Sequence, residues 1–261
     1  MDLSDFTILF PALIAGLLVL ITHVPLGMKV LARGIIFADL AVAQVAGLGV
    51  VAAGLLELTE YPFAVQGVAV TSALLGAALL SAIERKLPEV LEACIGLLFV
   101  LAATGGILLM SRDVHAGEHL KDLLAGQILW VSNSQLITAA IFTAVLLMLW
   151  RVFTERLGSF GFYALFALAV TVSVQLVGVY LVFASLIVPA LACRLYPPRV
   201  RLAAGYAVGA AGYMLGLGLS VFFDLPSGAM VVWTLALAGT AAYAMGPAGK
   251  VKAPVAKDFP D

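Results

Sequence analysis

Long apolar runs separated by short polar stretches make up most of the chain. A helix needs about 20 apolar residues to cross the hydrocarbon core of a bilayer. Runs of this kind lie at residues 6–24, 35–56, 62–83, 90–111, 135–153, 202–223 and 228–246. Each run predicts one transmembrane helix, so the pattern predicts an all-α integral membrane protein.

One further stretch, residues 161–193, has no charged residue and is too long for one span but short for two. Gly178 follows a full-length helix at 161–177, and we expect Pro189 to interrupt the return leg. Glycine and proline are tolerated at membrane depth where the backbone is buried in protein or lines a water-filled cavity. The pattern predicts a single domain over 1–261, a bundle of eight long helices with one short, broken span after Gly178.

The positive charges predict which way the helices cross. Lys and Arg gather in cytoplasmic loops. If the chain crosses twice within 161–193, every Lys and Arg except Arg112 and Lys121 falls on one side of the membrane. The sequence therefore predicts an outer amino terminus, a cytoplasmic carboxyl terminus and a flexible tail at 247–261.

Composition agrees with a membrane protein and excludes some functions. The chain is 63% hydrophobic and 11% charged, against roughly 45–50% apolar and about 25% charged in soluble domains. A net charge of −1 gives no basic surface for nucleic acid. Cys94 and Cys193 both lie in apolar runs and form no CxxC motif, so neither a disulfide framework nor a thiol metal site is indicated.

Asp39 is the ionisable residue placed most clearly inside a span. Such a residue costs about 2.5–3.5 kcal/mol on insertion scales and is a functional candidate by default. Gln44 follows five positions later, offset by about 140° around a helix. Two interpretations stay open: Asp39 attracts a cation in a water-lined pathway, or it pairs with Arg33 or Lys29 near the inner interface.

Other polar residues near the spans have plainer expected roles. Glu92 lies just inside the fourth span, beside Glu84 and Glu89, and is expected in an interfacial charge cluster. His23, beside Pro25 at the end of the first run, is expected at the inner interface.

The outer loop after the fourth span carries a weak metal-handling candidate formed by His115, Glu118 and His119. Read literally, HAGEH matches the inverted zinc-protease motif H-x-x-E-H. Gly117 disfavours the helix that the motif needs, and no third ligand is visible, so an intramembrane protease is discounted. No G-x-x-x-x-G-K-[ST] motif occurs in the chain. If the protein is a pump, its ATPase is another chain, and the protein itself is not an enzyme.

Three segments together resemble the zinc/manganese-type ABC permease family over nearly the whole chain. They are RGIIFADLAVAQVAGLGV, then EACIGLLFVLAATGGILLMS with LLAGQILWVS, and VGVYLVFASLIVPALACRLYPPRVR, which is the most specific. The third segment also resembles the siderophore and cobalamin permeases, in which a helix breaks, returns to the cytoplasm and leads to the ATPase contact.

The resemblance implies a permease of a bacterial inner membrane that works as a homodimer. It implies an ABC ATPase subunit on the inside, an extracytoplasmic metal-binding protein, no permanently bound cofactor, and a divalent metal ion as cargo. It also implies an ATPase contact near Tyr196, Arg199 and Arg201. The pathway residues that it implies are Asp39 and Gln44, together with the broken-helix residues Gly178, Ser185 and Pro189.

One departure from the family concerns the metal. Family members commonly carry a His about one turn after the Asp, whereas Val42 and Ala43 occupy that region here, with Gln44 beyond. An amide oxygen in place of imidazole weakens a zinc site and favours harder ions such as manganese. Zinc, manganese and iron therefore stay open, and so do two other functions: a permease for a metal chelate and a stand-alone ion-coupled carrier.

Overall fold

The computed structural model describes residues 3–58, 61–111, 128–153 and 158–247, and within these ranges it contains helices and no β-strand. The helices are α1 (Leu3–Arg33), α2 (Ala38–Leu55), α3 (Pro62–Lys86), α4 (Leu91–Leu109), α6 (Asn133–Phe153), α7 (Gly158–Val177), α8 (Val179–Ala192), α9 (Pro198–Phe223) and α10 (Ser227–Met245), with short 3-10 turns η2 (Pro88–Val90) and η3 (Ile128–Trp130). In the described part of the chain, eight helices are long and apolar enough to span a membrane, and α8 is a shorter apolar helix. The predicted fold class is therefore confirmed. The predicted flexible tail from residue 248 onward lies outside the described residues.

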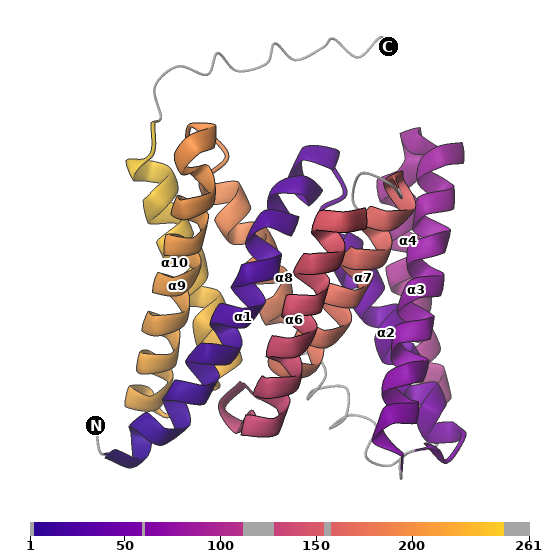
Figure 1. The fold of residues 1–261 in the computed structure, drawn as a ribbon, viewed down its shortest axis with the longest axis horizontal. Helices are drawn as coiled ribbons and strands as arrows, with labels where there is room; N and C mark the ends of the chain where they lie inside the picture. The colour runs from indigo at the N-terminus through magenta and orange to yellow at the C-terminus, as the bar shows by residue number, and fades with distance from the viewer. Residues whose placement is uncertain (1–2, 59–60, 112–127, 154–157, 248–261) are drawn as a thin grey trace.

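The helices form a bundle in which successive helices, the short α8 included, run in alternating directions (Figure 1). In this view the α9–α10 pair lies on one side and α2, α3 and α4 lie on the other. Between them are α1, α6, α7 and α8, with α1 crossing obliquely and packing extensively against α8 and α9. The start of α1 and the end of α10 lie at opposite ends of the bundle.

The break between α7 and α8 falls at Gly178, as predicted. Gly178 has a φ of 83°, a conformation that glycine adopts without the steric cost of a Cβ atom. The predicted interruption at Pro189 is wrong, because α8 continues through Pro189 to Ala192. Proline removes one helical hydrogen bond, but the packing of α8 against α1 supports the helix. Gly27 of α1 has no Cβ atom, so its backbone packs closely against the Leu186 carbonyl of α8. With 14 residues, α8 is about 21 Å long, which makes it a short span.

The first helix is longer than its apolar run predicts. It continues through Pro25 to Arg33, although a proline leaves the carbonyl four residues earlier without its helical donor. In α1 that carbonyl belongs to Ile21, and the Tyr206 hydroxyl of α9 donates to it at 3.1 Å. A side chain from another helix thus replaces the bond that Pro25 removes.

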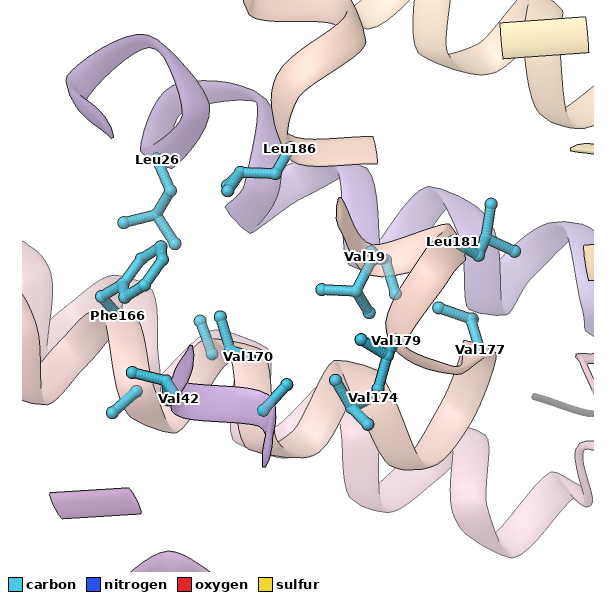
Figure 2. Close-up of a cluster of buried hydrophobic side chains, with 14 of the residues drawn as sticks. Val19, Leu26, Val42, Phe166, Val170, Val174, Val177, Val179, Leu181 and Leu186 are labelled. Carbon is cyan, nitrogen blue, oxygen red and sulfur yellow. The ribbon is translucent and has the colours of Figure 1, made fainter. Parts of the chain in front are cut away.

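A buried apolar cluster joins α1, α2, α7 and α8 at the centre of the bundle. Figure 2 shows its labelled members: Val19 and Leu26 of α1, Val42 of α2, Phe166, Val170, Val174 and Val177 of α7, and Val179, Leu181 and Leu186 of α8. The two arms of the broken span are therefore anchored in one core.

The glycines spaced along α9 permit close helix packing. Gly205 and Gly209 face Val24 and Leu20 of α1, while Gly212 and Gly216 face Leu235 and Val231 of α10. A Cβ atom at any of these positions would collide with its neighbour. One helix thereby holds α1 and α10 together.

Candidate functional site

An open cavity of about 670 Å³ lies between α2, α4, α8 and α10. Its walls are mostly apolar: Leu40, Gln44, Phe99, Ala103, Ile107, Val179, Tyr180, Phe183, Ala184, Val188, Gly228, Ala229, Val232, Trp233 and Ala236. The hydrogen-bonding side chains in this lining are Gln44, Tyr180 and Trp233. Gln44 is the pathway candidate that the structure places in the cavity wall.

A second cavity of about 410 Å³ continues the first along α8 and α10. The two share Val188 and Ala236, and the second ends beside Arg194 and Tyr243. The Arg194 guanidinium lies 5.4 Å from the centre of the Tyr243 ring. The two cavities adjoin at Val188 of α8 and Ala236 of α10, and we call the pair the furrow.

Asp39 lies on the same helix as Gln44 but faces the interior. Its side chain is 1% exposed, and neither carboxyl oxygen has a hydrogen-bond partner among the described residues. Leu40 and Gln44 line the cavity, whereas Asp39 does not. The two predicted pathway residues are therefore close in sequence but on different faces of α2.

The positive residues near Asp39 in sequence have contacts elsewhere. The Arg33 guanidinium forms a salt bridge of 3.6 Å with Glu84 and lies 4.1 Å from the centre of the Phe162 ring. The Lys29 ammonium lies 4.5 Å from the centre of the Trp150 ring. The structure thus gives no support to the interpretation in which Arg33 or Lys29 neutralises Asp39.

Glu92 links the start of α4 to the start of α2. Its Oε1 atom accepts a hydrogen bond of 3.3 Å from the backbone N–H of Phe37. Phe37 precedes the first residue of α2, where helical N–H groups lack helical acceptors. Glu92 therefore caps the start of α2, the helix that carries Asp39 and Gln44.

The broken-helix candidates do not all face the cavity. Val179 and Tyr180 line it directly after Gly178. Ser185 is fully buried on another face of α8, where its hydroxyl donates to the Leu181 carbonyl at 2.6 Å and lies 2.9 Å from the Tyr213 hydroxyl. Ser185 therefore joins α8 to α9, and Pro189 is likewise absent from the lining of both cavities.

The three candidates for an ATPase contact differ in their surroundings. Arg201 donates two hydrogen bonds of 3.1 Å to the backbone carbonyl of Tyr196. The Tyr196 hydroxyl donates to the Ala242 carbonyl of α10 at 2.8 Å. Arg199 is exposed in the first turn of α9. Of the three side chains, Arg199 is the one most available to a partner.

His23 is fully buried in α1, so its predicted place at the interface is wrong. The helix continues beyond Pro25 and carries His23 into the core. Its Nδ1 atom lies 3.0 Å from the Val19 carbonyl and 2.9 Å from the Thr22 hydroxyl. The apolar run underestimated the length of α1, because the helix continues past the end of the run through Lys29 to Arg33.

The outer-loop candidates His115, Glu118 and His119 lie outside the described residues. Among the residues that are described, no group of three or more His, Cys, Asp and Glu side chains could hold a metal ion. Among the pathway candidates with metal-binding oxygen atoms on α2, Gln44 lines the cavity and Asp39 is buried beside it in sequence but on another face.

Sequence reasoning did not single out Tyr180 or Trp233. Tyr180 follows the glycine break by two residues, and this position close to a helix break was the available signal. Trp233 lies in an evenly apolar helix, so its place in the cavity depends on how α10 packs. Both side chains are largely exposed in the single chain, at 55% and 69%.

Comparisons with known proteins agree with this architecture. A sequence profile described as the ABC 3 transport family matches residues 5–163 and 154–245. No curated protein matches the sequence. The structure resembles a chain of PsaBC from Streptococcus pneumoniae in complex with Fab, with 23% identity, a TM-score of 0.75 and 94% of each chain covered.

Proposed function

Since the chain belongs to the ABC 3 transport family, we propose that it is the membrane-spanning subunit of an ATP-driven importer for a divalent metal ion. Zinc and manganese are the proposed cargo, with iron as the next candidate. The sequence has no nucleotide-binding P-loop, so a separate ABC ATPase powers transport. A metal-binding protein outside the membrane delivers the ion.

The buried carboxyl group of Asp39 is the observation that carries this proposal. An ionised carboxylate buried without a partner is strongly unfavourable, and a passing cation would supply the missing partner. Gln44 offers an amide oxygen, a ligand suited to hard cations. The ion would meet Gln44 and Tyr180 in the cavity and then pass to Asp39, which lies nearer the start of α2.

A second copy of the chain is the proposed cover of the open cavity. An ion pathway must be shielded from lipid, because hydrocarbon cannot solvate a charge. The single chain leaves the cavity open at its side, where Trp233 and Tyr180 are exposed. Two copies facing each other across α8 and α10 would enclose one pathway and supply two sets of lining residues.

The charge distribution supports an orientation with the ATPase contact in the cytoplasm of a bacterial inner membrane. The Lys and Arg residues of the described chain lie at the end of the bundle where α1, α3, α6 and α8 finish. They are Lys29, Arg33, Arg85, Lys86, Arg151, Arg194, Arg199 and Arg201. Because positive residues mark cytoplasmic loops, this end is proposed to face inward.

Uptake into proteoliposomes that contain the chain, its ATPase and its binding protein tests the function. Zinc, manganese, iron and cobalt are offered in competition, with ATP enclosed or omitted. The proposal predicts uptake that requires hydrolysable ATP and favours one or two of these ions. Uptake that continues without ATP and collapses when a proton gradient is dissipated would instead identify a stand-alone carrier. Uptake of a chelate but of no free ion would identify a chelate permease.

A further inference from the structure

Residues 193–197, the turn that joins α8 to α9, are tied to the end of α10. The bond that makes this connection runs from the Tyr196 hydroxyl to the Ala242 carbonyl at 2.8 Å. It joins residues 46 positions apart in the sequence. The turn at the proposed ATPase contact is thereby hydrogen-bonded to α10, a helix that does not adjoin it in the sequence.

Tyr196 satisfies a carbonyl that α10 itself leaves without a donor. The last four carbonyls of a helix lack helical partners. The N–H that could bond Ala242 in a continuing helix belongs to Gly246, and it donates instead to the Tyr243 carbonyl. A Cβ atom on Gly246 would collide with the Tyr196 ring, so glycine at this position leaves room for the ring.

Two further contacts hold the turn in the same position. The two Arg201 hydrogen bonds to the Tyr196 carbonyl fix the backbone of the turn. Beneath it, Cys193 belongs to a small apolar cluster, separate from the main core, whose buried members are Ala192, Cys193 and Val208. Tyr196 and Ala242 pack against this cluster. The end of α8, the start of α9 and the end of α10 therefore form one packed unit.

The helices joined in this unit are the walls of the furrow. Tyr180 and Val188 of α8 line the larger cavity, as do Trp233 and Ala236 of α10. We propose that Tyr196 is a positioning residue for coupling, which makes α8 and α10 respond as one body to an ATPase bound at this turn. The proposal rests on the proposed function for the role of the ATPase, but the link itself is a property of the chain alone.

The chain offers a matched control for the Tyr196 bond. Tyr206 also donates its hydroxyl to a helix carbonyl without a helical donor, that of Ile21. Its bond joins α9 to α1 and touches neither cavity. Tyr196→Phe and Tyr206→Phe each remove one hydroxyl and one hydrogen bond while keeping the ring.

The first measurement needs no transport. Spin labels at Val200→Cys and Met245→Cys, in a chain with Cys94 replaced by Ala and the fully buried Cys193 kept, report the distance between the start of α9 and the end of α10 in nanodiscs. Tyr196→Phe should broaden this distance distribution, whereas Tyr206→Phe should leave it unchanged. An unchanged distribution in Tyr196→Phe would overturn the link, whatever the chain transports.

The second measurement is the number of ATP molecules hydrolysed per metal ion taken up in the reconstituted transporter. Loss of one neutral hydrogen bond should shift the equilibrium between joined and separated helices about fivefold toward separation, so the ratio should rise in Tyr196→Phe, with ATPase binding unchanged. Tyr206→Phe should keep the parent ratio. Equal ratios in both variants would overturn the coupling role. Absence of uptake in the parent, with the distance change still present, would count against the proposed function and leave the link standing.

Discussion

Asp39 and Gln44 lie five residues apart on α2, and the helix directs Asp39 into the core while Gln44 lines the open cavity. A cation in the cavity can reach the amide oxygen of Gln44 directly. To reach Asp39 it must displace the packing that buries the carboxyl group. The arrangement suits a pathway in which Gln44 is an accessible first ligand and Asp39 is a second ligand that is closed off from the cavity.

The identity of the residue at position 44 should influence which metal is transported. Gln44→His places an imidazole in the cavity wall, and imidazole is a better zinc ligand than an amide oxygen. We expect zinc to compete more strongly against manganese in uptake by this variant. Gln44→Ala is the control, because it removes the ligand without adding one; a shift toward zinc in both variants would show that the imidazole is not the cause.

Ser185 should matter for stability and not for the pathway. Ser185→Ala leaves the buried Tyr213 hydroxyl without its partner at 2.9 Å, which costs about 1–3 kcal/mol of folding free energy. Thermal unfolding in detergent should show a lower midpoint for Ser185→Ala and little change for Thr104→Ala, whose hydroxyl is exposed. Uptake per folded chain should stay at the parent level. Lost uptake with normal stability would place Ser185 in the pathway after all.

The second copy should cover the face that carries Trp233. Trp233 and Met148 are similarly exposed, at 69% and 71%, but only Trp233 lines the cavity. In a chain with Cys94 and Cys193 replaced by Ala, oxidation should cross-link Trp233→Cys into a dimer and leave Met148→Cys monomeric on a denaturing gel. The reverse pattern would move the interface to α6.

Arg199 and Arg201 should respond differently to charge reversal. Arg199→Glu changes an exposed side chain, so it should weaken binding of the ATPase while the unfolding temperature stays near the parent value. Arg201→Glu removes both hydrogen bonds to the Tyr196 carbonyl and should lower the unfolding temperature as well. Co-purification with the ATPase and thermal unfolding separate the two effects; identical behaviour in both assays would contradict the distinction.

Much of the fold follows from local features of the sequence. Apolar runs predict the spans, and Gly178 marks the break because its conformation requires a residue without a Cβ atom. The local sequence did not predict that α1 continues through Pro25. The carbonyl that Pro25 leaves without a helical donor accepts its hydrogen bond from the hydroxyl of Tyr206, which lies on a helix distant in sequence. The same limit applies to Pro189, whose helix is held by its packing against α1.

The candidate site was only partly predictable for a related reason. An acid within an apolar run indicates a functional residue through its insertion cost, and this identified Asp39. Which face of α2 meets the cavity depends on the packing of α4, α8 and α10. The place of Trp233 in the cavity and the burial of Ser185 are set by that packing and leave no pattern in the sequence around them, whereas Tyr180 was signalled by its position two residues after Gly178.

The central claim is that a carboxylate buried on α2 carries a divalent metal ion through an ATP-driven importer. ATP-dependent uptake by Asp39→Asn tests it most directly, because the amide keeps the shape of the side chain and removes the charge. Asp224→Asn is the matched control: Asp224 ends α9 with a φ of 52°, a conformation that asparagine also accepts. The account predicts that Asp39→Asn takes up no more metal than liposomes without ATP, while Asp224→Asn transports normally. Uptake at the parent rate by Asp39→Asn would contradict it.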